Sequence, residues 1–180
     1  EKFVGAYIEK GKVLEKMGKL PEAIEHFEIS LQFEDPSSFI FSKIGQCHQK
    51  LKNHQIAAKF YKKSITLDPS NIDAWNKIID FYIEINRYKK AIYYLESFLK
   101  IDYDNIESWE KIGSLYLKIN FYSLAKDALE KAIKLGSYNK ETWTNYIDSL
   151  LFLNRWEAAY ELAEEAKKHF PLDNSIDYRI

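Results

Sequence analysis

The side chains that could carry acid–base, nucleophilic or metal chemistry are few and scattered. The chain has four histidines, which are His26, His48, His54 and His169. None of them has a Ser or Cys nucleophile or a partner carboxylate at triad-like spacing. No Cys/His cluster has metal-site spacing, and no Gly-rich phosphate loop is present. We therefore expect no enzyme activity, no cofactor and no metal, and structural roles for the histidines.

Composition narrows the class of protein further. The chain is 46% hydrophobic and 29% charged, and it has only 6 Gly and 4 Pro, which favours a helical protein over a disordered or many-turned β protein. A net charge of -1 argues against nucleic-acid binding. No long apolar run or signal peptide is present, so we expect no membrane insertion. The single Cys47 cannot form an internal disulfide and is expected to be a small buried residue in a cytoplasmic protein.

A repeat of 34 residues organises the whole chain. Its most regular column is Ala23, Ala57, Ala91, Ala125 and Ala159, and three tryptophans share a second column at Trp75, Trp109 and Trp143. The repeats are 4–37, 38–71, 72–105, 106–139 and 140–173. We interpret 1–180 as a single array in which 174–180 begins a further helix, and expect it to be part of a longer repeat protein.

Each repeat predicts two helices joined by a tight turn. An apolar pattern at spacings of three and four runs for about 14 residues and makes one buried helical face. A helix-ending column follows, consisting of Gly18, Lys52, Asn86, Asn120 and Asn154. A second helix starts almost at once, and turn residues such as those in 68–71 and 102–105 close each unit and supply N-caps.

These columns resemble the tetratricopeptide repeat family. The second repeat carries the pattern as Phe41, Ile44, Gly45, His48, Ala57, Tyr61, Ser64 and Pro69, and the fourth as Trp109, Ile112, Gly113, Tyr116, Ala125, Leu129 and Ala132. Ile79 and Ile147 depart from it by replacing the glycine. The resemblance implies an all-α fold, a right-handed α-solenoid of five helix-turn-helix repeats. It also implies that Ala or Gly stands where helices approach closely, and that the Trp column with Tyr82 and Tyr116 packs between repeats.

The resemblance further implies a concave groove lined by the first helices. The candidate ligand-binding residues at groove positions are Lys12, Lys16, Phe39, Lys43, Gln46, Lys50, Asn76, Lys77, Asp80, Glu110, Lys111, Asn145 and Asp148. At these positions lysines outnumber acids in the first two repeats, and acids outnumber lysines in the last three. Such a groove favours an extended ligand with its own charge asymmetry, whereas the alternative is an ordinary solvated surface. Phe39 and Phe152 are possible apolar anchors.

The leading hypothesis is a non-catalytic scaffold that binds a protein or peptide. A clamp for a C-terminal carboxylate is not expected, because the family's clamp asparagines are missing and Asp73 would repel a carboxylate. The main alternative is a self-assembly module that forms homo-oligomers through exposed repeat ends. An RNA-binding helical repeat ranks lower, because Asp73, Glu107 and Glu141 make one groove column acidic.

Overall fold

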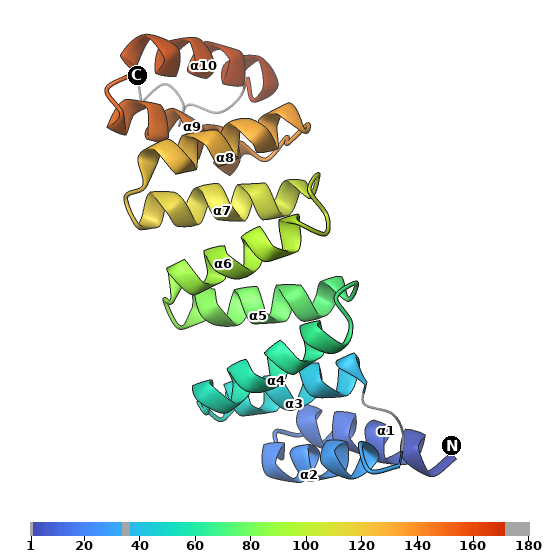
Figure 1. The fold of residues 1–180 in the computed structure, drawn as a ribbon. Helices are drawn as coiled ribbons and strands as arrows, with labels where there is room; N and C mark the ends of the chain where they lie inside the picture. Colours follow the sequence, from blue (N-terminus) through green and yellow to red (C-terminus); the bar gives the residue numbers. More distant parts are fainter. Residues whose placement is uncertain (1, 34–36, 172–180) are drawn as a thin grey trace. The chain divides into compact units, whose positions relative to one another are not determined.

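The computed structural model describes residues 2–33 and 37–171, and every regular element in these ranges is an α-helix (Figure 1). The ten helices are α1 (Lys2–Lys16), α2 (Leu20–Ser30), α3 (Ser38–Lys50), α4 (His54–Leu67), α5 (Ile72–Glu84), α6 (Tyr88–Leu99), α7 (Ile106–Lys118), α8 (Tyr122–Lys134), α9 (Lys140–Phe152) and α10 (Trp156–His169). The all-α prediction of paired helices is therefore confirmed. The further helix predicted at 174–180 lies outside the described residues.

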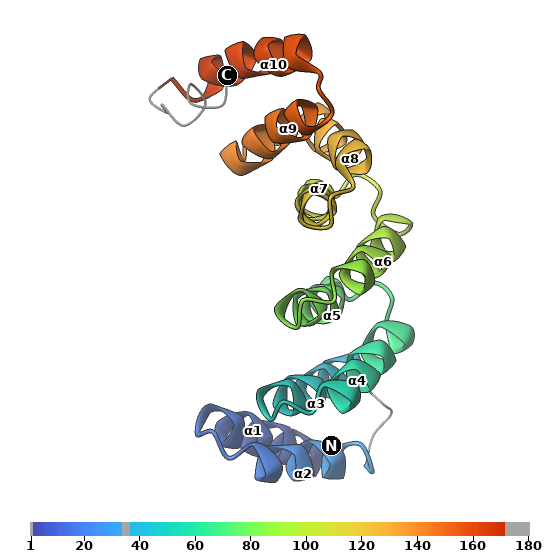
Figure 2. The same cartoon turned by 90° about the vertical axis from the view of Figure 1, so that its left-hand side faces the viewer.

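The chain divides into two compact units, Glu1–Tyr94 and Leu95–Ile180, and the division falls within α6. In the first unit, α1 packs on α2, α3 packs on α4, and the first helices α3 and α5 also touch (Figure 2). In the second unit, α7 packs on α8, α9 packs on α10, and the first helices α7 and α9 touch. Within each unit the first helices of successive repeats are thus neighbours that share a surface.

The turn inside each repeat depends on one residue with a left-handed backbone. The predicted helix-ending column has φ values of 77° at Gly18, 62° at Lys52, 56° at Asn86, 63° at Asn120 and 57° at Asn154. After each of these residues, the next backbone N–H donates to a carbonyl five positions earlier, as from Arg87 to Tyr82 at 2.8 Å. This bond satisfies a carbonyl at the helix end, and the prediction of the turn position is confirmed.

The loops between repeats are held by side chains. The N-cap residues Asn71, Asn105 and Asn139 accept hydrogen bonds from the backbone amides of the following first turns, at 3.1, 3.0 and 3.1 Å. The tryptophans use the same loops: Trp75, Trp109 and Trp143 each donate from Nε1 to a carbonyl six residues earlier, at 2.9, 2.8 and 3.1 Å. Each loop is therefore tied to the helix that follows it.

The two helices of a repeat approach closely at one position, where residue sizes are complementary. A Cβ built on Gly113 would lie 2.4 Å from Leu129, and one built on Gly45 would lie 2.9 Å from Tyr61. The fifth repeat reverses the sizes, because Ile147 occupies the glycine column and shares a core cluster with Ala163. The departure of Ile147 from the family pattern is thus accommodated by a small residue on the facing helix.

Candidate functional site

Glu15, near the end of α1, holds two lysines of α3 on the first-helix surface of the first unit. Its carboxylate oxygens lie 3.0 Å from Lys43 Nζ and 2.7 Å from Lys50 Nζ, and its side chain is 9% exposed. Burial raises the pKa of Glu15, but hydrogen bonds from Lys50 and Lys43 outweigh burial and leave the pKa below its usual range. Two lysines predicted to meet a ligand are therefore already paired with an ionised carboxylate.

Phe39, at the start of α3, presents an exposed ring beside two cations. The ring is 40% exposed, and its centroid lies 5.1 Å from Lys12 Nζ and 5.9 Å from Lys43 Nζ. Both ammonium groups are within cation–π range of about 6 Å. Lys12 also pairs with Glu9 at 2.7 Å. The Phe39 ring and the two ammonium groups therefore form one cluster, in which each lysine is also paired with a carboxylate.

A cavity of about 320 Å³, here named the first-helix pocket, opens on the same surface. Its lining residues are Glu15, Gln46, Gln49, Lys50, Tyr61, Lys77 and Asp80. Four of these are predicted groove residues, and they come from α3 and α5. The wall is ordered by hydrogen bonds: the Tyr61 hydroxyl donates to Gln49 Oε1 at 2.5 Å, and the Gln49 amide donates to Glu84. Burial raises the pKa of Tyr61, so its hydroxyl stays protonated and can donate.

The other predicted residues of the first unit lie outside this pocket. Lys16 is exposed on α1, and Asn76 is half-buried on α5. Neither lines the first-helix pocket. Of the candidates in the first unit, Gln46, Lys50, Lys77 and Asp80 therefore converge at the first-helix pocket, and the others do not line it.

In the second unit, some of the predicted groove residues form hydrogen bonds or ion pairs with other residues of the chain. Glu110 accepts a hydrogen bond from Ser137 Oγ and another from Asn139 Nδ2 at 3.4 Å, so it braces the loop before α9. Lys111 pairs with Glu107 at 2.9 Å along α7. Asn145 and Asp148 are half-buried on α9. These contacts give Glu110 a structural role in addition to any role in binding.

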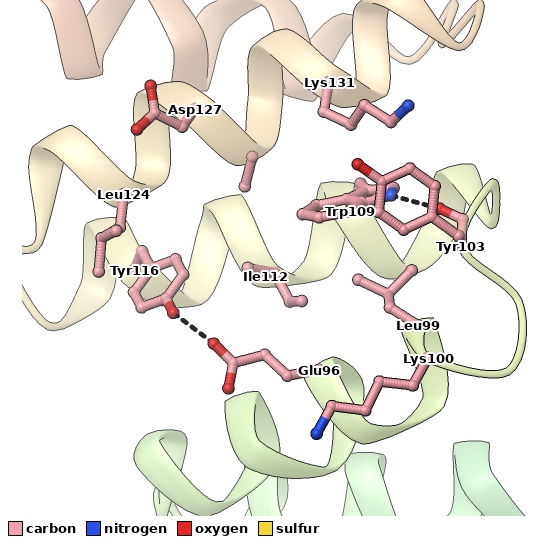
Figure 3. A pocket seen from close by; sticks show the side chains of 11 residues that line it. Glu96, Leu99, Lys100, Tyr103, Trp109, Ile112, Tyr116, Leu124, Asp127 and Lys131 are labelled. Atoms are coloured by element: carbon pink, nitrogen blue, oxygen red, sulfur yellow. Dashed lines mark hydrogen bonds between the residues drawn. The ribbon is translucent and has the colours of Figure 1, made fainter.

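A larger hollow of about 480 Å³ lies in the second unit between α6, α7 and α8 (Figure 3). Its lining residues are Glu96, Leu99, Lys100, Tyr103, Trp109, Ile112, Tyr116, Leu124, Asp127, Ala128 and Lys131. Figure 3 shows Tyr103 and Trp109 at one end of the hollow and Tyr116 with Glu96 at the other. We name it the Ala128 pocket, after the small residue that faces it from α8.

The Ala128 pocket corrects one prediction. Trp109 and Tyr116 were expected to be packed between repeats and therefore buried, and their counterparts Trp75, Trp143 and Tyr82 are buried, at 6%, 3% and 6% exposure. Instead Trp109 and Tyr116 are half-buried and line the pocket. The physical reason is the small side chain of Ala128 opposite them. The signal was present in the sequence, since the same column holds Phe60 and Tyr94 in the two preceding repeats.

The cysteine and histidine side chains that could take part in chemistry are packed against other side chains. Cys47 is fully buried, as expected, and burial raises the pKa of its thiol to about 11. His48 stacks on Phe60 with ring centroids 5.7 Å apart, and His169 lies 4.9 Å from the ring of Trp143. Among residues 2–33 and 37–171, no group of three His, Cys, Asp or Glu side chains could hold a metal ion. None of the described helices is long and apolar enough to cross a membrane.

Comparison with known proteins connects this geometry to a family. The model of the tetratricopeptide repeat matches residues 40–71 and 106–135, which are the bulk of the second and fourth repeats. A search of curated protein sequences finds no match. The fold, in contrast, is shared with many solved structures.

Three of these structures illustrate the likeness. MamA from Desulfovibrio magneticus RS-1 has 16% identity and a TM-score of 0.71, over 93% of this chain and 95% of that one. A tetratricopeptide repeat protein from Parabacteroides merdae has 15% identity and a TM-score of 0.76, over 99% of this chain and 71% of that one. YrrB, described as a TPR protein with an unusual peptide-binding site, has 14% identity and a TM-score of 0.71, over 96% and 89%.

Two repeats match the family model, the other repeats keep the same 34-residue frame, and the helix pairs align with solved arrays. At these identities the structural likeness establishes the fold and leaves function to the sites themselves. The second and fourth repeats are thus similar to the tetratricopeptide repeat, and the chain has the fold of solved tetratricopeptide repeat proteins.

Proposed function

We propose that this chain is a non-catalytic scaffold that binds an extended segment of a partner protein along its first helices. Tetratricopeptide repeat proteins generally mediate protein–protein interactions. The observation that carries the proposal is the first-helix pocket, where Gln46, Lys50, Lys77 and Asp80 from α3 and α5 converge around one cavity. Such a cavity offers both donors and acceptors to a backbone that crosses from one first helix to the next.

Recognition at this pocket would combine hydrogen bonding with charge. Gln46 supplies a donor and an acceptor, Lys77 a cation and Asp80 an anion, so a peptide backbone and a charged side chain can both be engaged. Charge complementarity across the surface would set orientation and association rate more than affinity. The peptide-binding site named in the description of YrrB supports the same use of this fold.

The test is a selection of peptides followed by binding measurements. Twelve-residue peptides would be selected on the parent chain from a displayed library, and their affinity measured by calorimetry. We expect Gln46→Ala with Lys77→Ala to weaken the selected peptides by about tenfold or more, as loss of central contacts does. Neither change touches the Glu15 cluster, and the Lys77–Asp73 ion pair that is lost lies on the helix surface, so we expect the variant to fold.

The matched control changes two residues on the second helix α4, Lys59→Ala with Lys62→Ala, which are exposed and do not line the pocket. It should bind the selected peptides like the parent. Equal affinities for the parent, the pocket variant and the control would contradict the proposal.

Self-assembly is the second candidate function, and it is favoured by one group of exposed aromatics. Trp156 and Tyr160 lie one helical turn apart on α10 and are 61% and 54% exposed, and Phe152 at the end of α9 is 59% exposed. Exposed apolar groups of this size mark association surfaces. If they pair copies of the chain, the mass measured by light scattering should rise with concentration, and Trp156→Glu with Tyr160→Glu should return it to that of one chain.

A further inference from the structure

At one position of the repeat, the size of a side chain on the second helix determines whether the space over the aromatic residues of the first helix is filled. This column consists of His26, Phe60, Tyr94, Ala128 and Leu162. In the first three repeats its ring packs on the aromatic at the tryptophan column. The ring centroids are 5.7 Å apart for Tyr7 and His26, 6.2 Å for Phe41 and Phe60, and 6.5 Å for Trp75 and Tyr94.

The third repeat shows the filled arrangement in full. Tyr94 stacks on Tyr82 with ring centroids 5.4 Å apart and an interplanar angle of 10°, and it also contacts Trp75. Trp75 and Tyr82 are consequently buried, at 6% exposure each. A phenol ring is therefore the group that this fold itself places between the tryptophan and tyrosine columns.

The fourth repeat lacks that ring but keeps its surroundings. Ala128 replaces the aromatic, and Trp109 and Tyr116, the counterparts of Trp75 and Tyr82, line the open cavity of about 480 Å³ (Figure 3). Leu99 and Ile112 are buried below 6% exposure and add apolar wall. This volume is within the range of roughly 300–1,000 Å³ that is typical of ligand sites.

The walls of the Ala128 pocket are held by the chain's own bonds. Trp109 Nε1 donates to the Tyr103 carbonyl at 2.8 Å, and the Tyr116 hydroxyl donates to Glu96 at 2.7 Å. The ring of Tyr103 meets Trp109 edge-on at 5.6 Å, and Lys131 Nζ covers that ring at 4.5 Å from its centroid. The aromatic walls are therefore fixed before any ligand arrives, which lowers the entropy lost on binding.

The pocket is separate from the first-helix surface. Successive helical residues are about 100° apart, so Trp109, Ile112 and Tyr116 fall on one side of α7 and Glu110 and Lys111 on roughly the opposite side. Binding here does not depend on the function proposed for the first-helix pocket.

We propose that the Ala128 pocket binds an aromatic side chain, Tyr or Phe, carried by a segment of a partner protein. The incoming ring takes the place that Tyr94 occupies one repeat earlier, between the walls formed by Trp109 and Tyr116. The rim carries two cations, Lys100 and Lys131, and two carboxylates, Glu96 and Asp127. It therefore does not select the charge of the partner segment, and selectivity comes from contacts with the incoming ring. Aromatic pairs of this kind favour offset or edge-to-face contacts beyond simple area burial.

The test uses the indole N–H signals of the ¹⁵N-labelled chain, which has four tryptophans. The signal of Trp109 is assigned from its loss in Trp109→Phe. The probes are the capped peptides Ala-Ala-Tyr-Ala-Ala and Ala-Ala-Leu-Ala-Ala, and p-cresol as a free aromatic. We expect the tyrosine peptide to shift the Trp109 signal saturably and the leucine peptide to bind about tenfold more weakly, with the Trp143 signal unmoved.

Two variants that each add one tyrosine make the test specific. Ala128→Tyr reproduces the third repeat and fills the pocket, so it should abolish the shift. Lys59→Tyr adds an exposed tyrosine to α4 and should leave the shift unchanged. If Ala128→Tyr does not give a folded spectrum, Ala128→Leu, which copies the fifth repeat, replaces it. Peptides selected on the first-helix pocket should bind both variants normally, so failure of one proposal is distinguishable from failure of the other.

Three outcomes would overturn the proposal. The first is equal binding of the tyrosine and leucine peptides. The second is a shift that persists in the filled variant, which would locate binding elsewhere. The third is a response to p-cresol without any response to the tyrosine peptide, which would make the pocket a site for small aromatic molecules.

Discussion

Replacing Gly113 tests the helix approach that defines a repeat. An added Cβ would lie 2.4 and 2.5 Å from Cγ and Cδ2 of Leu129, well inside ordinary contact distance. The overpacking should cost about 1–3 kcal/mol, whereas alanine favours the helix by about 1 kcal/mol over glycine. We therefore expect Gly113→Ala to lower the free energy of unfolding by up to about 2 kcal/mol, measured by urea denaturation followed by circular dichroism.

A second substitution decides whether size complementarity is the cause. Leu129→Ala alone should cost about 2–5 kcal/mol, because it empties a fully buried position. The double variant Gly113→Ile with Leu129→Ala copies the pair Ile147 and Ala163 of the fifth repeat, and the isoleucine should occupy the vacated volume. The double variant should therefore lose about 1–3 kcal/mol less stability than the summed losses of the single variants Gly113→Ile and Leu129→Ala.

Additive losses in this cycle would refute the interpretation that the two positions share one volume. A Gly113→Ala variant more stable than the parent would refute the close approach itself. The matched control is Gly5→Ala on α1, where an added Cβ would meet no atom within 4 Å. That change should raise stability by the helix propensity alone, about 0.5–1 kcal/mol.

Three further outcomes follow from the structure. Because the folded-state pKa of Glu15 is lowered, its contribution to stability is present above its ordinary pKa of 4.5 and is lost as pH falls through the folded value; acid denaturation should show this, and Glu15→Gln should flatten that part of the curve. Lys52 has φ of 62°, so Lys52→Gly should raise the free energy of unfolding by about 0.5–1 kcal/mol in urea denaturation. Trp143→Ala should cost about 3–5 kcal/mol and Trp109→Ala clearly less in the same assay, since only Trp143 is fully packed.

The helices and turns were predictable because their signals are local and repeated. The left-handed residue after each first helix and the asparagine caps depend on the conformational preferences of single residues, and five copies in register fixed their positions. The candidate groove residues, in contrast, were taken from the family resemblance, and Gln46 and Lys77 are two of those that line the first-helix pocket.

The state of the side chains on that surface could not be predicted in the same way. Glu15 pairs with lysines that are 28 and 35 residues away. Which lysines it pairs with depends on rotamers and burial, and no column of the 34-residue repeat determines these. Glu110 is similarly engaged by Ser137 of the following loop. The Ala128 pocket is a different case, because it could have been predicted from the sequence. Ala128 occupies the column that holds Phe60 and Tyr94 in the two preceding repeats, and its small side chain leaves the space unfilled.

The Ala128 pocket illustrates how a small residue in one repeat leaves open a space that an aromatic ring fills in the repeat before it. Alanine is the best helix former, so the change from an aromatic costs α8 nothing in helix propensity. The walls stay in place because Trp109 is bonded to its loop and Tyr116 to Glu96, instead of depending on the missing ring for position. In the third repeat, Tyr94 stabilises the chain by burying Trp75 and Tyr82. In the fourth repeat, the free energy of burying Trp109 and Tyr116 can instead be gained when a partner binds. An aromatic group that arrives on another chain can complete the packing and gain affinity from surfaces that already face one another.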